Sequence, residues 1–220
     1  MKKFFIVAHR GASAYELENT LEAFKKAIDL GAKFIECDVR KSKDNELVVI
    51  HDSSLQRLWR RAEYVNELNA DELKNFKIPK LSEVIDLIKK YKDVKLLIEI
   101  KEEGIEEKLI DLLKKKHFLR KAIIVSFFEK SLEKIKQISN VKTGFIFSVR
   151  LDAIEVALKL KPNFIIPRYD TITKELIKIA HKNKMKVIAW TINDKNTALK
   201  LIKIGVDGIA TDKPDLLERE

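Results

Sequence analysis

The sequence predicts a (β/α)8 barrel of the TIM type, with a short insertion between its second and third barrel strands. Short apolar runs alternate with amphipathic stretches along the chain, as in a barrel whose parallel strands are each followed by a helix. Eight such units in 220 residues average 27.5 residues each, which is lean but sufficient. An open doubly wound sheet is the alternative. It requires a glycine-rich phosphate loop after its first strand, and the segment HRGASAYELENT found there is not such a loop.

The expected strands are rich in Ile, Val and Phe. Most are continuously apolar, as parallel strands covered by helices are. They span Phe4–Ala8, Phe34–Val39, Leu96–Ile100, Ala122–Ser126, Thr143–Phe147, Phe164–Pro167, Val187–Thr191 and Gly208–Ala210.

The expected helices lie between these strands and carry apolar residues at helical spacing, as the segment LSEVIDLIKKY illustrates. They span Thr20–Leu30, Leu81–Tyr91, Ile105–Lys116, Lys130–Ile138, Asp152–Leu160, Lys174–Asn183, Lys195–Ile204 and Pro214–Glu218.

The longest unit follows the second strand. An additional apolar run, Leu47–Ile50, ends there in His51 and Asp52, and the turn-forming pair Asp44-Asn45 precedes it. We therefore interpret residues 37–50 as a strand, a turn and a returning strand.

Length and composition indicate one domain covering residues 1–220. Apolar residues make up 45% and charged residues 35%, and no stretch resembles a linker. The single cysteine, Cys37, excludes a disulfide framework and suits a reducing compartment. The apolar run near the start is too short for a signal peptide, and no run approaches the ~20 residues of a membrane-spanning helix. We therefore expect a cytoplasmic protein without stable membrane insertion.

The net charge of +10 raises the possibility of a nucleic-acid partner. Most lysines, however, recur at helical spacing on expected outer faces, as in LIDLLKKKH, which indicates a solvated surface. A nucleic-acid binder would rest on charge alone, because no motif of that kind is present, so we expect no nucleic-acid partner. The oligomeric state is not indicated by the sequence.

Three carboxylates are expected at strand ends. Glu36 and Asp38 are two residues apart on one strand and therefore share a face, and Glu99 lies on the next barrel strand. Three buried carboxylates repel one another, and a divalent cation would relieve this; oxygen ligands favour Mg²⁺ or Ca²⁺. The alternative is an ion-pair network with Arg10 and Lys101.

Two histidines and two cations join this cluster. His9 and His51 follow strands, and the pKa range of imidazole suits proton transfer near neutrality. Arg10 and Lys101 would bring positive charge, which arginine offers as a bidentate fork and lysine as a point charge. Together these groups indicate chemistry on a phosphate ester.

The other two histidines, His117 and His181, lie among lysines on expected helices. We interpret both as surface residues.

The segment HRGASAYELENTLEAFKKAIDLGAKFIECDVRKSKDNELVVIHD resembles the motif of the glycerophosphodiester phosphodiesterases. Further similarity lies in EIK at Glu99–Lys101, SF at Ser126-Phe127, WTIN at Trp190–Asn193 and GVDGIATDKPD near the end. The resemblance implies a barrel enzyme that cuts glycerophosphodiesters with a divalent metal.

The resemblance also implies a role for each matching residue. His9 and His51 would be the acid–base pair, and Arg10 and Lys101 would bind phosphate. The metal ligands would be Glu36, Asp38 and Glu99, and the residues lining the pocket for the alcohol would be Phe127 and Trp190, although strand-end aromatics can equally be core residues.

The chain departs from the family pattern in several places. Leu17 stands where the family usually has Pro before ENT, and Asn45 replaces the usual Gly of a DG turn. After His51-Asp52 the family commonly has an R-T-T stretch with glycines, whereas this chain has RLWRRAEYV. The insertion found in this region of many members is reduced to about 40 residues. Asn19 is expected to cap the following helix, with Glu22 completing a capping box.

The leading hypothesis is hydrolysis of a small-molecule glycerophosphodiester to glycerol phosphate and an alcohol. A lysophospholipase D acting on a larger lipid would use the same site, so only the pocket would distinguish it. An inactive barrel that serves as a binding protein is a third hypothesis. The presence of all five residues of the acid–base pair and the metal set argues against it.

Overall fold

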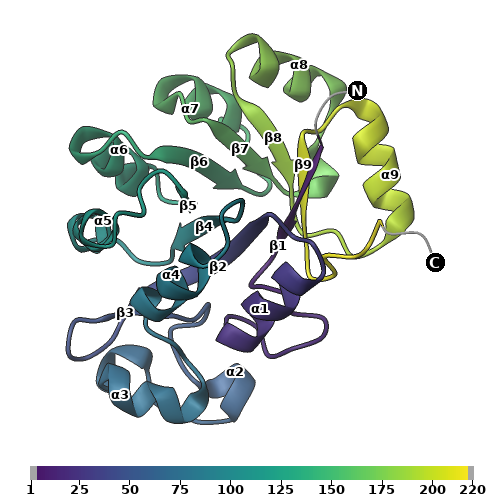
Figure 1. Cartoon of the computed structure of the whole chain (residues 1–220). Helices are drawn as coiled ribbons and strands as arrows, with labels where there is room; N and C mark the ends of the chain where they lie inside the picture. Colours follow the sequence, from purple (N-terminus) through teal and green to yellow (C-terminus); the bar gives the residue numbers. More distant parts are fainter. Residues whose placement is uncertain (1–3, 218–220) are drawn as a thin grey trace.

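A computed structural model describes residues 4–217 and confirms the predicted barrel (Figure 1). Within these residues eight parallel strands form a closed ring, because β1 pairs with β2 on one side and with β9 on the other. The ring strands are β1 (Phe5–Ala8), β2 (Phe34–Lys41), β4 (Lys95–Ile100), β5 (Ala122–Ser126), β6 (Lys142–Phe147), β7 (Phe164–Pro167), β8 (Lys186–Ala189) and β9 (Gly208–Thr211).

Helices surround the ring and pack their apolar faces against it (Figure 1). They are α1 (Leu21–Asp29), α4 (Leu81–Lys89), α5 (Glu106–Lys115), α6 (Glu129–Ile138), α7 (Ala153–Leu160), α8 (Lys174–Lys182) and α9 (Lys195–Ile204). The expected final helix, Pro214–Glu218, is wrong for its described part, because residues 214–217 form a turn, and Glu218 lies outside the described residues.

The insertion begins with the predicted returning strand. β3 (Leu47–Val49) pairs antiparallel with the end of β2, and the turn between them includes Asn45 with a φ of 65°. The short helices α2 (Gln56–Trp59) and α3 (Ala70–Leu73) follow, and they lie together beside β3 in Figure 1. Seven buried residues give this insertion a small apolar core: Val48, Ile50, Leu55, Val65, Ala70, Leu73 and Ile78.

Alternation along β2 assigns its side chains to two environments. Ile35, Cys37 and Val39 belong to the core between the strands and the helices. Glu36 and Asp38 take the other face, toward the barrel interior, as the period of two predicts. Each parallel strand therefore stabilises the fold with one face and can carry site residues on the other.

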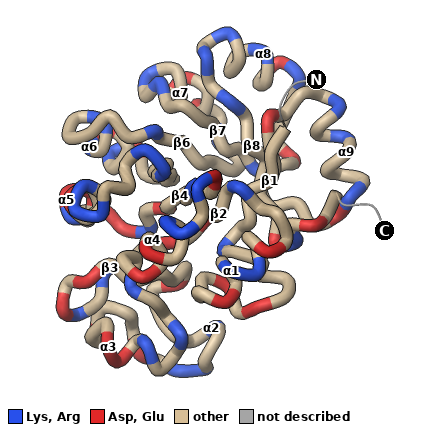
Figure 2. The backbone as a smooth tube through the Cα atoms, viewed as in Figure 1, with Lys and Arg blue, Asp and Glu red and all other residues tan. Residues whose placement is uncertain are grey.

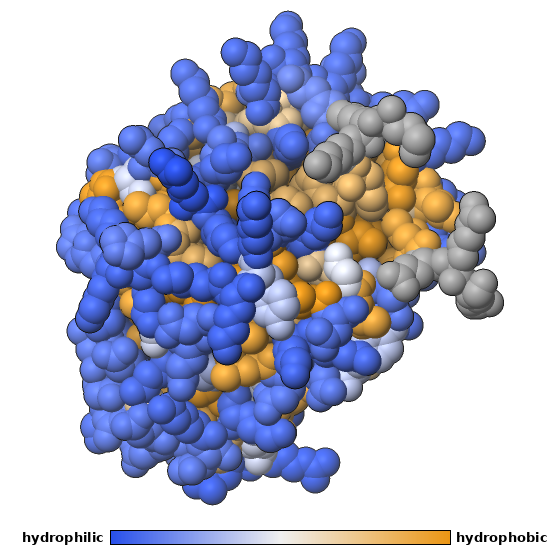
Figure 3. Space-filling model, in the orientation of Figure 1, coloured by the Kyte–Doolittle hydropathy of each residue, from blue (hydrophilic) through white to orange (hydrophobic). Residues whose placement is uncertain are grey.

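The basic residues are distributed over the outer helices. Figure 2 shows Lys and Arg on α5 to α9, and hydrophilic residues cover most of the face seen in Figure 3. This distribution agrees with the interpretation of the charge as a solvated surface. Among residues 4–217, none of the helices has both the length and the hydropathy needed to cross a membrane.

Gly11 allows the β1–α1 loop to pack closely against α1, because it has no side chain. Its φ is +84°, and a Cβ built there would lie 2.7 Å from the carbonyl carbon of Ala23. Gly31 has nearly the same φ, +82°, but nothing lies within 4 Å of its Cβ position. The two glycines therefore share the conformational requirement and differ in the space around them.

Gly11→Ala should destabilise the fold more than Gly31→Ala. Both substitutions introduce left-handed strain of order 1–3 kcal/mol, and overpacking at Gly11 should add about 1–3 kcal/mol. Urea unfolding of the two variants measures the difference between their free energies of unfolding. Equal losses in the two variants would show that contact with Ala23 does not constrain the loop.

Candidate active site

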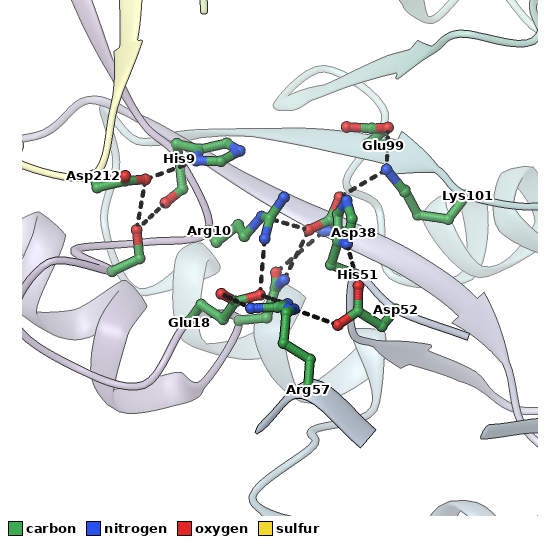
Figure 4. Close-up of polar contacts among 12 residues, drawn as sticks. His9, Arg10, Glu18, Asp38, His51, Asp52, Arg57, Glu99, Lys101 and Asp212 are labelled. Atoms are coloured by element: carbon green, nitrogen blue, oxygen red, sulfur yellow. Dashed lines mark hydrogen bonds and ion pairs between the residues drawn. The ribbon is translucent and has the colours of Figure 1, made fainter. Parts of the chain in front are cut away.

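A cavity of about 130 Å³ opens at the C-terminal end of the barrel strands. Its charged wall comes from the ends of β1 to β4, and its apolar wall comes mainly from β5 to β9. Eight of the residues named from the sequence line it: His9, Arg10, Glu36, His51, Glu99, Lys101, Phe127 and Trp190. Figure 4 shows the charged groups, which come from segments far apart in the sequence.

Three carboxylates converge beside this cavity. Oxygen atoms of Glu36, Asp38 and Glu99 lie within 4.8 Å of one another, and each residue is at most 8% exposed. The strand register explains the convergence, because Asp38 on β2 is the direct neighbour of Glu99 on β4. The structure thus brings together the three carboxylates that strand spacing places at one mouth.

The cluster is unfavourable when all three groups are charged. Burial raises the pKa of Glu36 well above its ordinary value, and the charges of Asp38 and Glu99 raise it further. Burial and the charge of Asp38 also raise the pKa of Glu99, to about 7, although Lys101 opposes the shift. Burial would raise the pKa of Asp38 too, but attraction to Arg10 and Lys101 outweighs it and lowers that pKa. Without further positive charge, the cluster retains a proton near neutral pH.

Two cations supply part of this charge. The Arg10 backbone N–H donates to Glu36 Oε2 at 2.8 Å, and Arg10 Nε lies 3.2 Å from Asp38 Oδ2. Lys101 Nζ donates to Glu99 Oε1 at 2.8 Å and lies 3.7 Å from Asp38 Oδ1. The ion pairs expected under the alternative are therefore present, but two positive charges cannot balance three carboxylates.

The cluster also fits a divalent cation. Within residues 4–217, Glu36 Oε1 and Asp38 Oδ1 are buried and have no hydrogen-bond partner. Buried acceptors of this kind are costly unless something binds them. Carboxylate oxygens are the ligands that hard cations such as Mg²⁺ and Ca²⁺ prefer. Glu36, Asp38 and Glu99 could therefore hold one such ion in addition to the ion pairs.

Each cavity histidine is oriented by a carboxylate (Figure 4). His9 Nδ1 lies 2.7 Å from Asp212 Oδ1, and His51 Nδ1 lies 2.7 Å from Asp52 Oδ1. Because Nδ1 is engaged in both rings, Nε2 is the nitrogen left for the cavity. Burial, aided by the charge of Arg10, lowers the pKa of His51 against the attraction of Asp38.

Asp212 is held firmly in its charged form. Burial would raise its pKa, but hydrogen bonds from His9, Asn193 and Ser13 outweigh it and lower the pKa to about 2. Sequence reasoning assigned no role to Asp212 or Asp52. Both lie inside the quoted motifs, but Asp212 is 203 residues from His9, and only closure of the barrel brings the two together.

The prediction that Asn19 caps the first helix is wrong. Its φ of 60° is left-handed, whereas a helix cap has an extended backbone. Thr20 is the cap, and its side chain accepts from the Ala23 N–H. The Asn19 side chain instead donates to Asp38 Oδ2 at 2.8 Å and accepts from the Asp38 N–H at 3.2 Å. Asn19 therefore belongs to the site, where it fixes Asp38.

Phe127 and Trp190 form an aromatic part of the cavity wall. Their rings pack edge to face with centroids 5.5 Å apart. Trp190 Nε1 donates to the carbonyl of Ile166 at 2.8 Å, so the indole presents an apolar surface. Lys101 Nζ lies 5.8 Å from the centre of the Phe127 ring and so joins the charged wall to the aromatic one.

The two remaining histidines lie outside the cavity. His117 is exposed just after α5, as expected of a surface residue. The surface interpretation is incomplete for His181, because its Nε2 lies 2.7 Å from Oδ2 of the buried Asp207. His181 thus has a structural role at α8.

Comparisons with known proteins agree on one family. The model of the glycerophosphoryl diester phosphodiesterase family matches residues 9–216. A glycerophosphodiester phosphodiesterase of Caldanaerobacter subterraneus is 37% identical, over 98% of this chain and 96% of its own. The crystal structure of the Thermotoga maritima enzyme of the same name is 30% identical, with a TM-score of 0.87 over 98% of this chain and 97% of its own. An Oleispira antarctica phosphodiesterase, solved in complex with the product sn-glycerol-3-phosphate, is 28% identical, with a TM-score of 0.86 over 96% and 93% of the two chains. The chain belongs to the glycerophosphoryl diester phosphodiesterase family.

Proposed function

We propose that this protein hydrolyses glycerophosphodiesters to glycerol phosphate and an alcohol, with a divalent metal and a pair of histidines. One observation carries the proposal: a buried carboxylate cluster, two cations and two carboxylate-oriented histidines meet in one cavity. Relatives named for this activity, and one solved with sn-glycerol-3-phosphate, support the substrate class. Within this proposal the chain is a single catalytic domain that acts in the cytoplasm.

Charge balance supports the metal. Glu36, Asp38 and Glu99 would hold Mg²⁺ or Ca²⁺, which supplies electrostatic stabilisation of the charged transition state when bound. With Arg10 and Lys101, the three carboxylates leave one negative charge. A divalent cation and the single negative charge of a phosphodiester would together bring the site to neutrality.

The side chains of the cavity divide the remaining work. Arg10 and Lys101 would bind the phosphate, one as a fork and the other as a point charge. His9 and His51 would move protons through Nε2, one as base and the other as acid, with exchanged roles in a second step. A hydroxyl of the glycerol moiety would attack the phosphorus and give its proton to the base, while the P–O bond to the alcohol breaks and the alcohol leaves with a proton from the acid. Water would then open the resulting cyclic phosphate by attack on the phosphorus, with cleavage of the P–O bond to the glycerol hydroxyl that attacked first.

The apolar wall would receive the alcohol or the glycerol carbons. Phe127 and Trp190 offer ring faces, and Ile146, Ile166 and Ile188 extend the same surface. A lysophospholipid is the second candidate substrate, because this wall also suits a hydrocarbon segment. A panel of both substrate classes, assayed with the same protein, distinguishes the two.

Removal of the metal should abolish turnover. EDTA should stop hydrolysis, and added Mg²⁺ or Ca²⁺ should restore it. Glu99 must lose a proton to bind the ion, so metal affinity should rise as pH increases through about 7. Calorimetric titration in buffers of different ionisation enthalpy measures the protons released.

Glu36→Ala should weaken metal binding with little loss of fold, and the exposed Glu103→Ala serves as the control. Full activity in excess chelator would exclude the metal from the mechanism.

Substitutions at the two phosphate-binding cations should impair catalysis. Arg10→Lys keeps the charge but loses the fork, and Lys101→Ala loses the charge. Each should lower kcat/KM about 10- to 100-fold, since a hydrogen bond to a charged group contributes ~1.5–3 kcal/mol. Lys95→Ala, at the opposite end of β4, is the matched control. Unchanged kinetics in both site variants would place the phosphate elsewhere.

Loss of either cavity histidine should lower the rate roughly 10²–10⁴-fold. The double variant His9→Ala/His51→Ala should lower the rate little more than either single variant does, because the two residues act as a unit. Steady-state kinetics at saturating metal tests both statements, with the exposed His117→Ala as control. Near-normal kcat in either single variant would contradict the paired mechanism.

A further inference from the structure

Arg57 binds two carboxylates at the edge of the cavity (Figure 4). It lies in the short helix α2, as the first residue of the segment RLWRRAEYV, and its side chain is 45% exposed. Nη1 and Nη2 donate to the two oxygens of Glu18 at 2.9 and 2.6 Å, and Nε donates to Asp52 Oδ2. All three donor nitrogens of the guanidinium are therefore engaged by protein groups.

Both carboxylates bound by Arg57 in turn hold a cavity residue. Asp52 engages His51 Nδ1 through its other oxygen, Oδ1, at 2.7 Å. Glu18 accepts a hydrogen bond from Arg10 Nη1 at 2.9 Å. A continuous chain of hydrogen bonds thus runs from His51 through Asp52, Arg57 and Glu18 to Arg10, and it joins the β1–α1 loop to the insertion.

The histidine on the other side of the cavity is supported differently. The carboxylate of Asp212 is held by the neutral donors Ser13 and Asn193. Among the described residues no comparable neutral donor holds Asp52, and the guanidinium of Arg57 binds its second oxygen. Without Arg57 the Asp52 carboxylate, whose side chain is 25% exposed, would be free to rotate away from the imidazole. Glu18 would at the same time keep Arg10 as its one remaining partner among these groups.

Taking the phosphodiesterase function above as its basis, we propose that Arg57 is a positioning residue of this site. It fixes His51 through Asp52, so that Nε2 faces the substrate, and it fixes the Arg10 fork through Glu18. Arg57 itself does not touch the substrate. A planar fork is needed for this role, because the bidentate contact to Glu18 and the third contact to Asp52 use three separate nitrogens.

Arg57→Ala should lower kcat on the order of 10-fold or more, as loss of an outer partner of a site residue commonly does, with a smaller change in KM. Guanidinium chloride at tens of millimolar should restore part of the lost rate, because the side chain is half-exposed and the vacated space is open to solvent. Sodium chloride at equal ionic strength should not. Arg57→Lys should recover less than wild-type activity, since a point charge cannot bridge both carboxylates. Adding Asp52→Asn to Arg57→Ala should lower kcat little further, because the two residues act through one contact.

Arg61→Ala is the matched control, because Arg61 lies in the same insertion and is paired with the neighbouring Glu63. It should leave kinetics unchanged.

A rise in KM alone in Arg57→Ala would mean that Arg57 binds substrate directly and would overturn the proposal. Wild-type kinetics in Arg57→Ala, or a loss that guanidinium does not relieve while Arg57→Lys is fully active, would also overturn it. If the wild-type protein turned over no glycerophosphodiester, the proposed function would fall together with this role. Active wild type with unaffected Arg57 variants would remove only the role of Arg57.

Discussion

Repulsion among three buried carboxylates is the constraint on which the rest of the site depends. Glu36, Asp38 and Glu99 lie within 4.8 Å of one another, where desolvation and like charge both disfavour ionisation. Arg10 and Lys101 reduce the imbalance without removing it. The site is therefore arranged to bind a cation. A fold that holds three mutually repelling carboxylates in this arrangement must be rigid around them.

The barrel supplies that rigidity through its register. Parallel pairing of β2 with β4 sets Asp38 beside Glu99, and Asn19 holds Asp38 by its side chain and its backbone. The antiparallel return of β3 delivers His51 to the same mouth. Closure of the ring between β1 and β9 delivers Asp212 to His9. The strand pairings that position these side chains therefore lie outside the cavity.

Local pattern was sufficient for much of this arrangement. The period of two places Glu36 and Asp38 on one strand face, and apolar runs locate the barrel strands to within about two residues at each end. The antiparallel return strand also followed from the turn pair Asp44-Asn45 and the apolar run after it. The single-domain organisation and the absence of a nucleic-acid partner stay predictions.

Contacts between distant segments were beyond the reach of local pattern. Asn19 resembles a helix cap in sequence, and only its left-handed backbone and its contact with Asp38 show its use. Arg57 contacts Glu18 from 39 positions away, and only the fold of the insertion brings the two side chains together. The composition of residues 214–217 suits a helix, but these residues form a turn after β9. Because β9 is the last strand of the barrel, no helix is needed there to connect it to a further strand.

The stability of the metal-free protein as a function of pH tests the central claim most directly. The folded pKa of Glu99 is about 7, above its ordinary value of 4.5, so its contribution to stability is complete below pH 4.5 and is lost as pH rises through about 7. Urea unfolding should therefore show a decrease in the free energy of unfolding between pH 5 and 8. Glu99→Gln should reduce this decrease and leave the part that comes from Glu36, whose pKa burial also raises. Added Mg²⁺ or Ca²⁺ should stabilise the wild type at pH 8 and have little effect at pH 5. Identical pH profiles for the wild type and Glu99→Gln, with no effect of metal at pH 8, would contradict a strained carboxylate cluster that awaits a cation.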